Sequence, residues 1–266
     1  MTTSGVTFDC AGYNITGNGS GYAFNISYKN NIVIKNCIIS NFSRAISAEN
    51  AINLAFINIT IYNVTDYGIF VNASINTNLS KISISESRPS AIAIAGANLT
   101  GVYLLNVTNG NFSDISIQKL FAGNTSVTSQ PGGSVVGISY QVSQNSNFTN
   151  IYIGNLFPGR GIATQTAALF GHSGNATGIF GSNFNSTVFQ NISIHNLLGS
   201  QGSRGRNSGT GGDGSEGSNI FGFYASNAVN STISNLTISN LSSGIGGNGG
   251  TGSVGGDGNA LPGHLP

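Results

Sequence analysis

The chain has 266 residues, with nine basic and eight acidic side chains and a formal net charge of +1. This balance provides neither a basic face for nucleic acid nor an acidic tail, and no apolar run is long enough for a membrane span. Polarity comes instead from Asn, Ser, Thr and 39 glycines. A surface with so few charges is expected to carry a hydrophilic coat or to associate.

The N-terminal residues, MTTSGVTFDC, lack the charged and apolar regions of a signal peptide. Three explanations stay open at this point. A leader has been removed from the numbering, the chain is a fragment of a longer protein, or the protein is cytosolic.

Short runs rich in Ile, Val and Phe alternate with Ser, Thr and Asn, which indicates strands rather than helices. A 20-residue block recurs seven times between residues 23 and 241. The blocks start at Ala23, Ala45, Gly68, Gly101, Gly137, Gly178 and Gly222. Position 17 of the block is always Ile, and positions 2, 12 and 15 are apolar throughout.

The spacing of the apolar positions predicts bends. Positions 15 and 17 keep the strand period of two, but three residues separate 12 from 15 and 17 from 20, so a flat strand cannot hold them on one face. Corners at positions 14 and 19 resolve this, and most of those residues are Asn, which tolerates left-handed backbone angles. The pattern predicts a coil of parallel strands with Asn stacked at its corners.

Four charged residues replace Asn at the corners of two successive blocks. Stacking of neighbouring turns would bring Lys81 against Asp114 and Glu86 against Lys119. Both pairs have opposite signs, as neighbouring turns require, so these four charges are interpreted as structural.

The stretches VTFDCAGYNITG (6–17) and IVIKNCIISNF (32–42), with blocks such as NISIHNL (191–197), resemble the right-handed parallel β-helix proteins of pectate-lyase-like fold. They are most similar to the short parallel β-helix repeat surface proteins of archaea and bacteria. The resemblance is specific for the fold rather than for function. We therefore predict an all-β fold: one right-handed parallel β-helix solenoid of about eight rungs, forming a single domain over 1–266.

Excursions between the blocks lengthen along the chain and are expected on one side of the solenoid. The last two, 198–221 and 242–266, are rich in glycine, and each contains GGDG at the same offset from its block. They are either flexible linkers or ordered, stacked, extended segments that only glycine lets approach closely. Asp213, Glu216 and Asp257 in these segments could hold calcium; the alternative is that they are solvated loop charges.

No catalytic constellation is apparent in the sequence. Glycoside hydrolysis needs two carboxylates on either side of one bond, and the pair about one rung apart, Glu49 and Asp66, with Arg44 nearby, is interpreted as a solvated face. One Met and three His cannot form a soft metal site. We predict neither an enzyme nor a cofactor, with a polysaccharide lyase or hydrolase as a less favoured alternative.

Asn-x-Ser/Thr sequons are the strongest chemical signal: 19 of the 36 asparagines begin one. Some, such as Asn58 and Asn191, are also corner residues. The asparagines outside positions 14 and 19 are predicted to carry N-linked glycans. They are Asn78, Asn111 and Asn147 at block position 11, together with Asn14, Asn18, Asn25, Asn72, Asn98, Asn106, Asn124, Asn175, Asn185 and Asn230.

Cys10 and Cys37 are the only cysteines, and they lie about one rung apart. In an oxidising compartment a disulfide is expected to join the first two rungs. The alternative is a pair of buried thiols.

These features favour an extracellular, N-glycosylated structural protein that associates end to end with itself in a surface layer, fibre or filament. Partners among other surface glycoproteins or polysaccharides are compatible with it, and nucleic acid is not. The alternative is a carbohydrate-binding or host-binding adhesin resembling a tail-spike module. An adhesin should cluster exposed aromatic residues, whereas Tyr103, Tyr140, Tyr152 and Tyr224 are interpreted as lying at different block positions.

Overall fold

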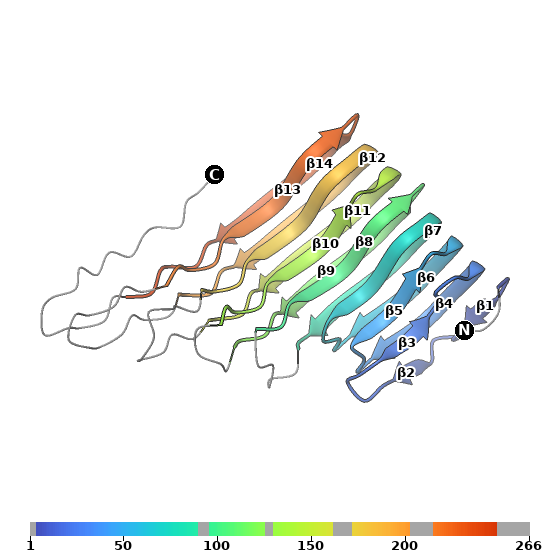
Figure 1. Ribbon diagram of the computed structural model, residues 1–266, viewed down its shortest axis with the longest axis horizontal. Coiled ribbons are helices and arrows are strands. Elements are labelled where there is room, and N and C mark those ends of the chain that lie inside the picture. Colours follow the sequence, from blue (N-terminus) through green and yellow to red (C-terminus); the bar gives the residue numbers. More distant parts are fainter. Residues whose placement is uncertain (1–3, 90–95, 126–129, 162–171, 203–214, 249–266) are drawn as a thin grey trace, which may run out of the picture.

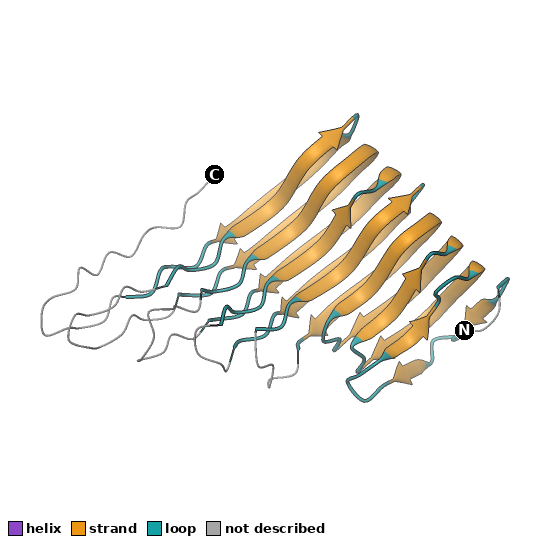
Figure 2. Cartoon of the chain, in the orientation of Figure 1, coloured by secondary structure: helices purple, strands orange, loops and turns teal. Residues whose placement is uncertain are grey.

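The computed structural model describes residues 4–89, 96–125, 130–161, 172–202 and 215–248, and these form a coil of parallel strands without a helix (Figures 1 and 2). The strands are β1 (Thr7–Asp9), β2 (Asn14–Thr16), β3 (Tyr22–Asn25), β4 (Asn30–Ser40), β5 (Arg44–Glu49), β6 (Ile52–Tyr62), β7 (Tyr67–Ser87), β8 (Leu99–Thr108), β9 (Asn111–Phe121), β10 (Val135–Gln141), β11 (Gln144–Phe157), β12 (Ala176–Leu198), β13 (Ile220–Val229) and β14 (Thr232–Ser242).

Each strand pairs in parallel with the strand one turn later in the chain. Ile34 of β4 is aligned with Phe56 of β6, which is aligned with Leu79 of β7. The stacked corner residues Asn36 and Asn58 lie 22 residues apart, whereas Asn191 and Asn235 lie 44 apart, because each later turn includes a longer excursion. The predicted parallel β-helix is therefore confirmed.

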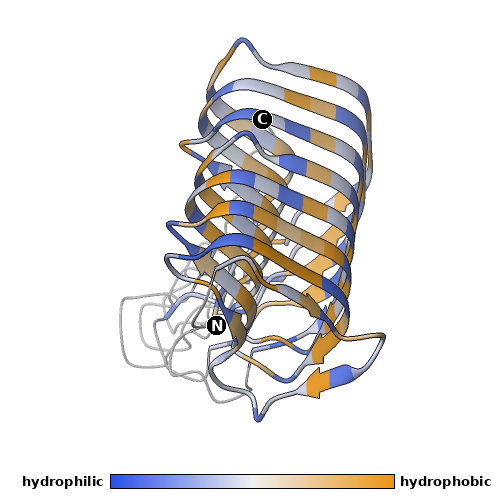
Figure 3. Cartoon of the chain, turned by 90° about the vertical axis from the view of Figure 1, so that its right-hand side faces the viewer, coloured by the Kyte–Doolittle hydropathy of each residue, from blue (hydrophilic) through white to orange (hydrophobic). Residues whose placement is uncertain are grey.

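The seven blocks stack in the register that the sequence predicts. Ile84, Ile117 and Ile153 of block position 17 follow one another in neighbouring turns. All three side chains are fully buried, and Figure 3 shows hydrophobic residues repeated at the same place in successive turns. Identical side chains thus stack along the axis into one continuous aliphatic core.

Glycine at block position 1 faces the isoleucine of position 17 across this core. A Cβ on Gly137 would lie 2.8 Å from Cγ2 of Ile153 and 2.6 Å from the carbonyl oxygen of Gly178 in the next turn. The coil is flattened here, and the missing side chain of one strand makes room for the branched side chain of the other.

Left-handed backbone angles mark the corners. All fourteen residues at positions 14 and 19 have φ between 49° and 58°. At these corners the Asn side chains form ladders in which Nδ2 donates to Oδ1 of the previous turn, as from Asn58 to Asn36 (2.9 Å) and from Asn235 to Asn191 (3.0 Å). The corner prediction is confirmed.

Two further corners, at block positions 6 and 9, were not predicted. Position 9 is Asn in six blocks, and Asn53, Asn76 and Asn109 form a third ladder there. The signal was present in the repeated Asn. Position 6 is Asn in four blocks, and Tyr28, Ala73 and Val142 are its residues in the other three, so its signal is weaker than that of position 9.

Both pairs of charged residues stack in the predicted register, because the residues on either side of them are aligned between β7 and β9. Nζ of Lys119 lies 3.0 Å from Glu86. Lys81 and Asp114 form no ion pair among the described residues, and Asp114 accepts instead from Nδ2 of Asn150 at 3.0 Å. An exposed pair contributes little, whereas an acceptor-only carboxylate can start an amide ladder that continues into later turns.

Candidate functional site

The described ends of the excursions, which we call the stems, leave the coil on one side and bond to each other (Figure 2). The N–H of Ala122 donates to Phe157 (2.9 Å) and that of Thr125 to Arg160 (3.1 Å). The same spacing recurs in the next stems. The N–H groups of Gly199 and Gly202, again three residues apart, donate to the carbonyl groups of Ser242 and Ile245. A period of three is that of an extended polyproline-II-type chain, so the stems are ordered, stacked, extended segments.

Glycine is required in the stems by close approach rather than by backbone angle, because none of the stem glycines described has a positive φ. A Cβ on Gly159 would lie 1.9 Å from the carbonyl oxygen of Gly123, and one on Gly174 would lie 1.9 Å from that of Gly133. Backbones that approach this closely leave no space for any side chain.

The calcium candidates are not brought together in the described structure. Asp213 and Asp257, with their GGDG segments, lie outside the described residues, and Glu216 is exposed. Over the ranges that the structure describes, no group of three His, Cys, Asp or Glu could hold a metal ion. Calcium binding by the Gly-rich excursions stays a prediction.

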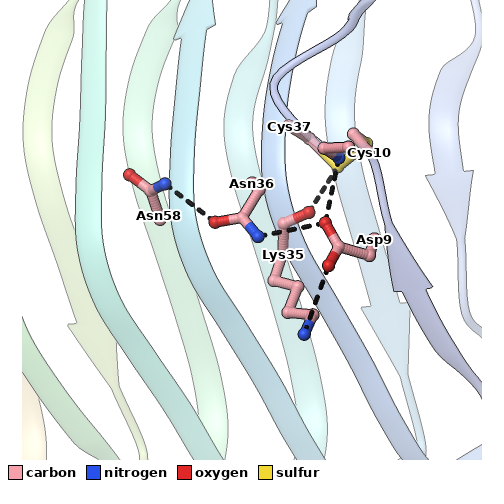
Figure 4. Close-up of a disulfide and its surroundings, with 7 residues drawn as sticks. Asp9, Cys10, Lys35, Asn36, Cys37 and Asn58 are labelled. Atoms are coloured by element: carbon pink, nitrogen blue, oxygen red, sulfur yellow. Dashed lines mark hydrogen bonds and ion pairs between the residues drawn. A yellow bond between two sulfur atoms is a disulfide. The ribbon is translucent and has the colours of Figure 1, made fainter.

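A disulfide joins Cys10 to Cys37 across the first two turns, with Cα atoms 4.9 Å apart (Figure 4). Beside it, the Asp9 carboxylate accepts from Nδ2 of Asn36 (3.0 Å) and lies 3.2 Å from Nζ of Lys35. The hydrogen bond from Asn36, followed by that from the Ala11 N–H, lowers the pKa of Asp9. Asp9 thus begins the ladder that continues through Asn36 and Asn58.

Replacing both cysteines by serine is expected to lower the free energy of unfolding by about 2–4 kcal/mol, because the bond closes a long loop in the unfolded chain. Intact mass before and after reduction first establishes the bond in the native protein, through a gain of about two hydrogens. An unchanged mass would establish free thiols instead.

Most predicted glycan acceptors are exposed. Among the thirteen, Asn72 and Asn78 are half-buried and the rest are exposed. Asn106 and Asn230 are corner residues with φ of 52° and 48°, which corrects their assignment to excursions or outer faces.

Two groups of these asparagines have bonds that the sequence did not suggest. At position 11, Nδ2 of Asn111 donates to Oδ1 of Asn78 (3.1 Å). On the stems, Oδ1 of Asn98, Asn124 and Asn175 each accepts a backbone N–H from the following excursion, at 2.7, 2.8 and 3.1 Å.

The outward aromatic residues do share one block position, contrary to the prediction. Tyr103 and Tyr224 are both at position 3, where Phe70 stacks on Tyr103 (5.4 Å, 6°) and Phe180 on Tyr224 (5.3 Å, 1°). The two stacks belong to one column that a serine interrupts. Because each stack consists of two rings, each ring has one face covered by its partner.

The other two tyrosines have different surroundings. Tyr140 is fully buried and its hydroxyl hydrogen-bonds Thr187 (3.1 Å), while burial raises its pKa. Tyr152 lies on another outer face beside His195 (5.7 Å).

Arg44 organises the N-terminal part of the aromatic column. Its guanidinium lies 4.8 Å from the Tyr67 ring centroid and bonds to Asp66 at 2.9 Å. Burial, and then the Asp66 charge, raise the pKa of Tyr67. Asp66 is therefore paired and half-buried rather than solvated. Glu49 and Asp66 do not form a common site in the described structure.

The structure also brings together three residues that the sequence reasoning missed. Nε2 of His195 lies within hydrogen-bonding distance of the Ser193 hydroxyl, and Nδ1 lies 2.6 Å from that of Ser239 in the next turn. The Ser-x-His spacing on one strand face was the available signal. The backbone around it is paired in the sheet, so it offers no free N–H groups to stabilise an oxyanion, and the arrangement lacks that part of a hydrolase site.

The last described turn is open to solvent. Ile233 and Ile238 are 47% and 39% exposed, whereas their counterparts one turn earlier, Phe189 and Ile194, are fully buried. Leu236 and Leu241 are exposed in the same way. Inward-facing residues of the core thus form an apolar end face.

Comparisons with known proteins found similar solved structures but no sequence relative. No protein-family model matches the chain, and no curated protein matches its sequence. Among solved structures it is similar to the A-module of the Azotobacter vinelandii mannuronan C-5 epimerase AlgE4, at 12% identity and a TM-score of 0.31 over 89% of this chain and 84% of that one.

Two further structures are similar at a lower level. The catalytic domain of a GH87 alpha-1,3-glucanase matches at 10% identity and a TM-score of 0.29, over 91% of this chain but 64% of that domain. The receptor-binding domain of the siphovirus 9NA tailspike matches at 13% identity and a TM-score of 0.15, over 90% and 53%. Within the described residues no helix is long and apolar enough to cross a membrane.

Proposed function

We propose that this protein is an extracellular, N-glycosylated structural subunit of a surface layer, fibre or filament, built as a solenoid of about eight turns and associating along its axis. The observation that carries the proposal is the exposure of eleven of the thirteen predicted acceptor asparagines on a chain with only 17 charged residues. A surface with so few charges favours association unless it is coated.

The outer sides of the solenoid support the same function. Exposed sequons such as Asn147 and Asn185 lie on strands β11 and β12. Glycans there would supply the hydrophilicity that a chain with so few charges lacks, and they would keep neighbouring solenoids from approaching side to side. Contact would then be directed to the ends.

Glycopeptide mapping of the native protein tests the coat. Asn147 is expected to be occupied more often than Asn191, because Nδ2 of Asn191 donates to Asn150 while its Oδ1 accepts from Asn235. Asn150 and Asn155 have no sequon and serve as unmodified controls. Native protein without sugar on its exposed sequons would contradict this part of the proposal, and electron microscopy of the same material shows whether axial assemblies exist.

A carbohydrate-binding or host-binding adhesin is the second candidate, favoured by the cluster of Tyr67, Phe70 and Tyr103 around Arg44. A glycan array distinguishes the two functions. Binding that is lost in Tyr67→Ala but kept in Tyr13→Ala, a variant of an isolated exposed tyrosine, would favour the adhesin.

A further inference from the structure

One arginine on the outer surface of the solenoid is surrounded by aromatic rings. Arg44 of β5 is aligned with Tyr22 of β3 in the preceding turn and with Tyr67 of β7 in the following turn. Its guanidinium carbon lies 5.8 Å and 4.8 Å from the centroids of these two rings, and 5.0 Å from that of Phe70. Cation–π contacts stabilise the charge in this position. We call Arg44 with its three rings the Arg44 cluster.

Asp66 fixes the orientation of the guanidinium. Nε of Arg44 donates to the Asp66 carboxylate at 2.9 Å, and the two side chains are 26% and 35% exposed. Within the described structure this is the one hydrogen bond of the Arg44 side chain. The N–H groups of both Nη atoms therefore have no protein partner there, and the exposed part of the side chain makes them available to a ligand.

These donors match an oxyanion. The guanidinium is planar, and its paired N–H groups fit a carboxylate or a sulfate through two parallel hydrogen bonds. Because the ring contacts and Asp66 already restrict the Arg44 side chain, little further conformational entropy would be lost when a ligand binds. The Arg44 cluster is thus preorganised to hold one negatively charged group.

The rings beside Arg44 favour a ligand that also has an apolar face. Tyr22 is 46% exposed, whereas Tyr67 and Phe70 are half-buried. A saccharide combines an apolar ring face with polar substituents, and a tyrosine side chain, apolar in its body and polar at its tip, can contact both. A sugar that carries an oxyanion therefore matches both parts of the cluster.

A second group of outer aromatic residues lacks the cation. Phe221 and Phe180 both contact Tyr224, but the residue aligned with Phe221 in the preceding turn is Thr177. The two groups share the aromatic rings and differ in the arginine. Comparing them separates the contribution of Arg44 from that of aromatic contact alone.

We propose that the Arg44 cluster binds an acidic saccharide. The Nη groups of Arg44 hold its carboxylate or sulfate group, and Tyr22 contacts the apolar face of the sugar ring. This goes beyond the structural function and gives the adhesin candidate a class of ligand. It does not depend on axial association, so a failure to bind and a failure to assemble are separate results.

Titration of the full chain, followed by ligand-observed NMR, compares four probes. Glucuronate and glucose 6-sulfate carry a ring and an oxyanion, whereas glucose lacks the charge and acetate lacks the ring. At least one acidic sugar is expected to bind about tenfold or more tightly than glucose and acetate, and the tighter of the two identifies the preferred oxyanion. Sequons at Asn25 and Asn72 lie on β3 and β7, so the native protein is measured before and after enzymatic removal of its glycans. Binding in either sample supports the site.

Four variants locate the binding. Arg44→Lys keeps the charge but loses the planar fork, and it should weaken binding of the acidic sugar at least about tenfold. Tyr22→Ala, at an exposed ring, should weaken it severalfold and serves as the test if Arg44→Lys loses its strands by circular dichroism. Arg160→Lys makes the same change at an exposed arginine elsewhere, and Phe180→Ala alters the second aromatic group. Each of these two controls should change the affinity less than about twofold.

Four results would overturn the proposal. Glucose that binds as tightly as the acidic sugars, with no change in Arg44→Lys, would establish a site for neutral sugars and leave the adhesin candidate intact. Acetate that binds as tightly would establish an anion site without a role for the sugar ring. An equal loss of affinity in Arg160→Lys would mean a general effect of basic residues. No binding of any probe, with or without the glycans, would remove the site altogether.

Discussion

Ile117→Asn is expected to lower the free energy of unfolding by about 4 kcal/mol, which is among the largest effects of a single substitution. Ile117 is fully buried between Ile84 and Ile153 of the neighbouring turns. The amide would lose apolar contacts and enter a region with no polar partner, where an unsatisfied polar group is costly. Chemical denaturation monitored by circular dichroism measures the change.

Two control variants separate the effect of burying an amide from the effect of replacing an isoleucine. Ile75→Asn changes the same residue types at an exposed site of β7 and should alter the free energy of unfolding by less than about 0.5 kcal/mol. Ile117→Val removes one methylene group and should cost about 1 kcal/mol. A melting temperature of Ile117→Asn within a degree or two of the unmodified protein would contradict the assigned register.

Gly159→Ala is expected to separate the stems and to lower the free energy of unfolding by about 3 kcal/mol. The new Cβ would meet Gly123 O at 1.9 Å and Gly133 N at 2.8 Å. Both are backbone atoms of hydrogen-bonded chains: Gly133 donates to Gly123 (2.9 Å), and Gly159 donates to Gly133 (2.8 Å). Neither can move away without breaking these bonds.

Gly154→Ala is the matched control, five residues earlier in the chain. Its Cβ would meet nothing closer than the Tyr152 hydroxyl at 3.2 Å, the end of a side chain that can shift, so stability should change by less than about 0.5 kcal/mol. Hydrogen exchange of the Gly133 and Gly174 amides shows whether only the stems separate or the whole chain loses stability. Unchanged protection there in Gly159→Ala would mean that the stems are not stacked as described.

The core register and two of the four corners could be read from the sequence because each feature recurs in seven copies. Ile at position 17 is invariant, so its column could not be missed. Position 6 is Asn in only four blocks, and residues as different as Tyr28 and Val142 adopt the same left-handed angle in others. Where the neighbouring turns dictate the conformation, the residue type reveals the corner less clearly.

Contacts between outer faces were harder to predict than the core. The bond from His195 to Ser239 joins residues 44 apart, and that separation is set by the length of an excursion with no fixed length of its own. The aromatic column, in contrast, was visible in the sequence. Tyr103 and Tyr224 are each the third residue of their blocks. Lys81 stacks on Asp114 as predicted but forms no ion pair with it in the described structure, because stacking alone does not decide which partner an exposed charge selects.

The interruptions of the corner ladders have a mechanical consequence. Turns stacked along one axis carry an axial pull in series, and each junction transmits the same force. Between β4 and β6 three bonds join corner amides of successive turns. Only the bond from Asn76 to Asn53 does so between β6 and β7, and only that from Asn150 to Asp114 between β9 and β11, in the described structure. Under tension along the axis, these two junctions have the least help from side chains and are expected to open before their neighbours.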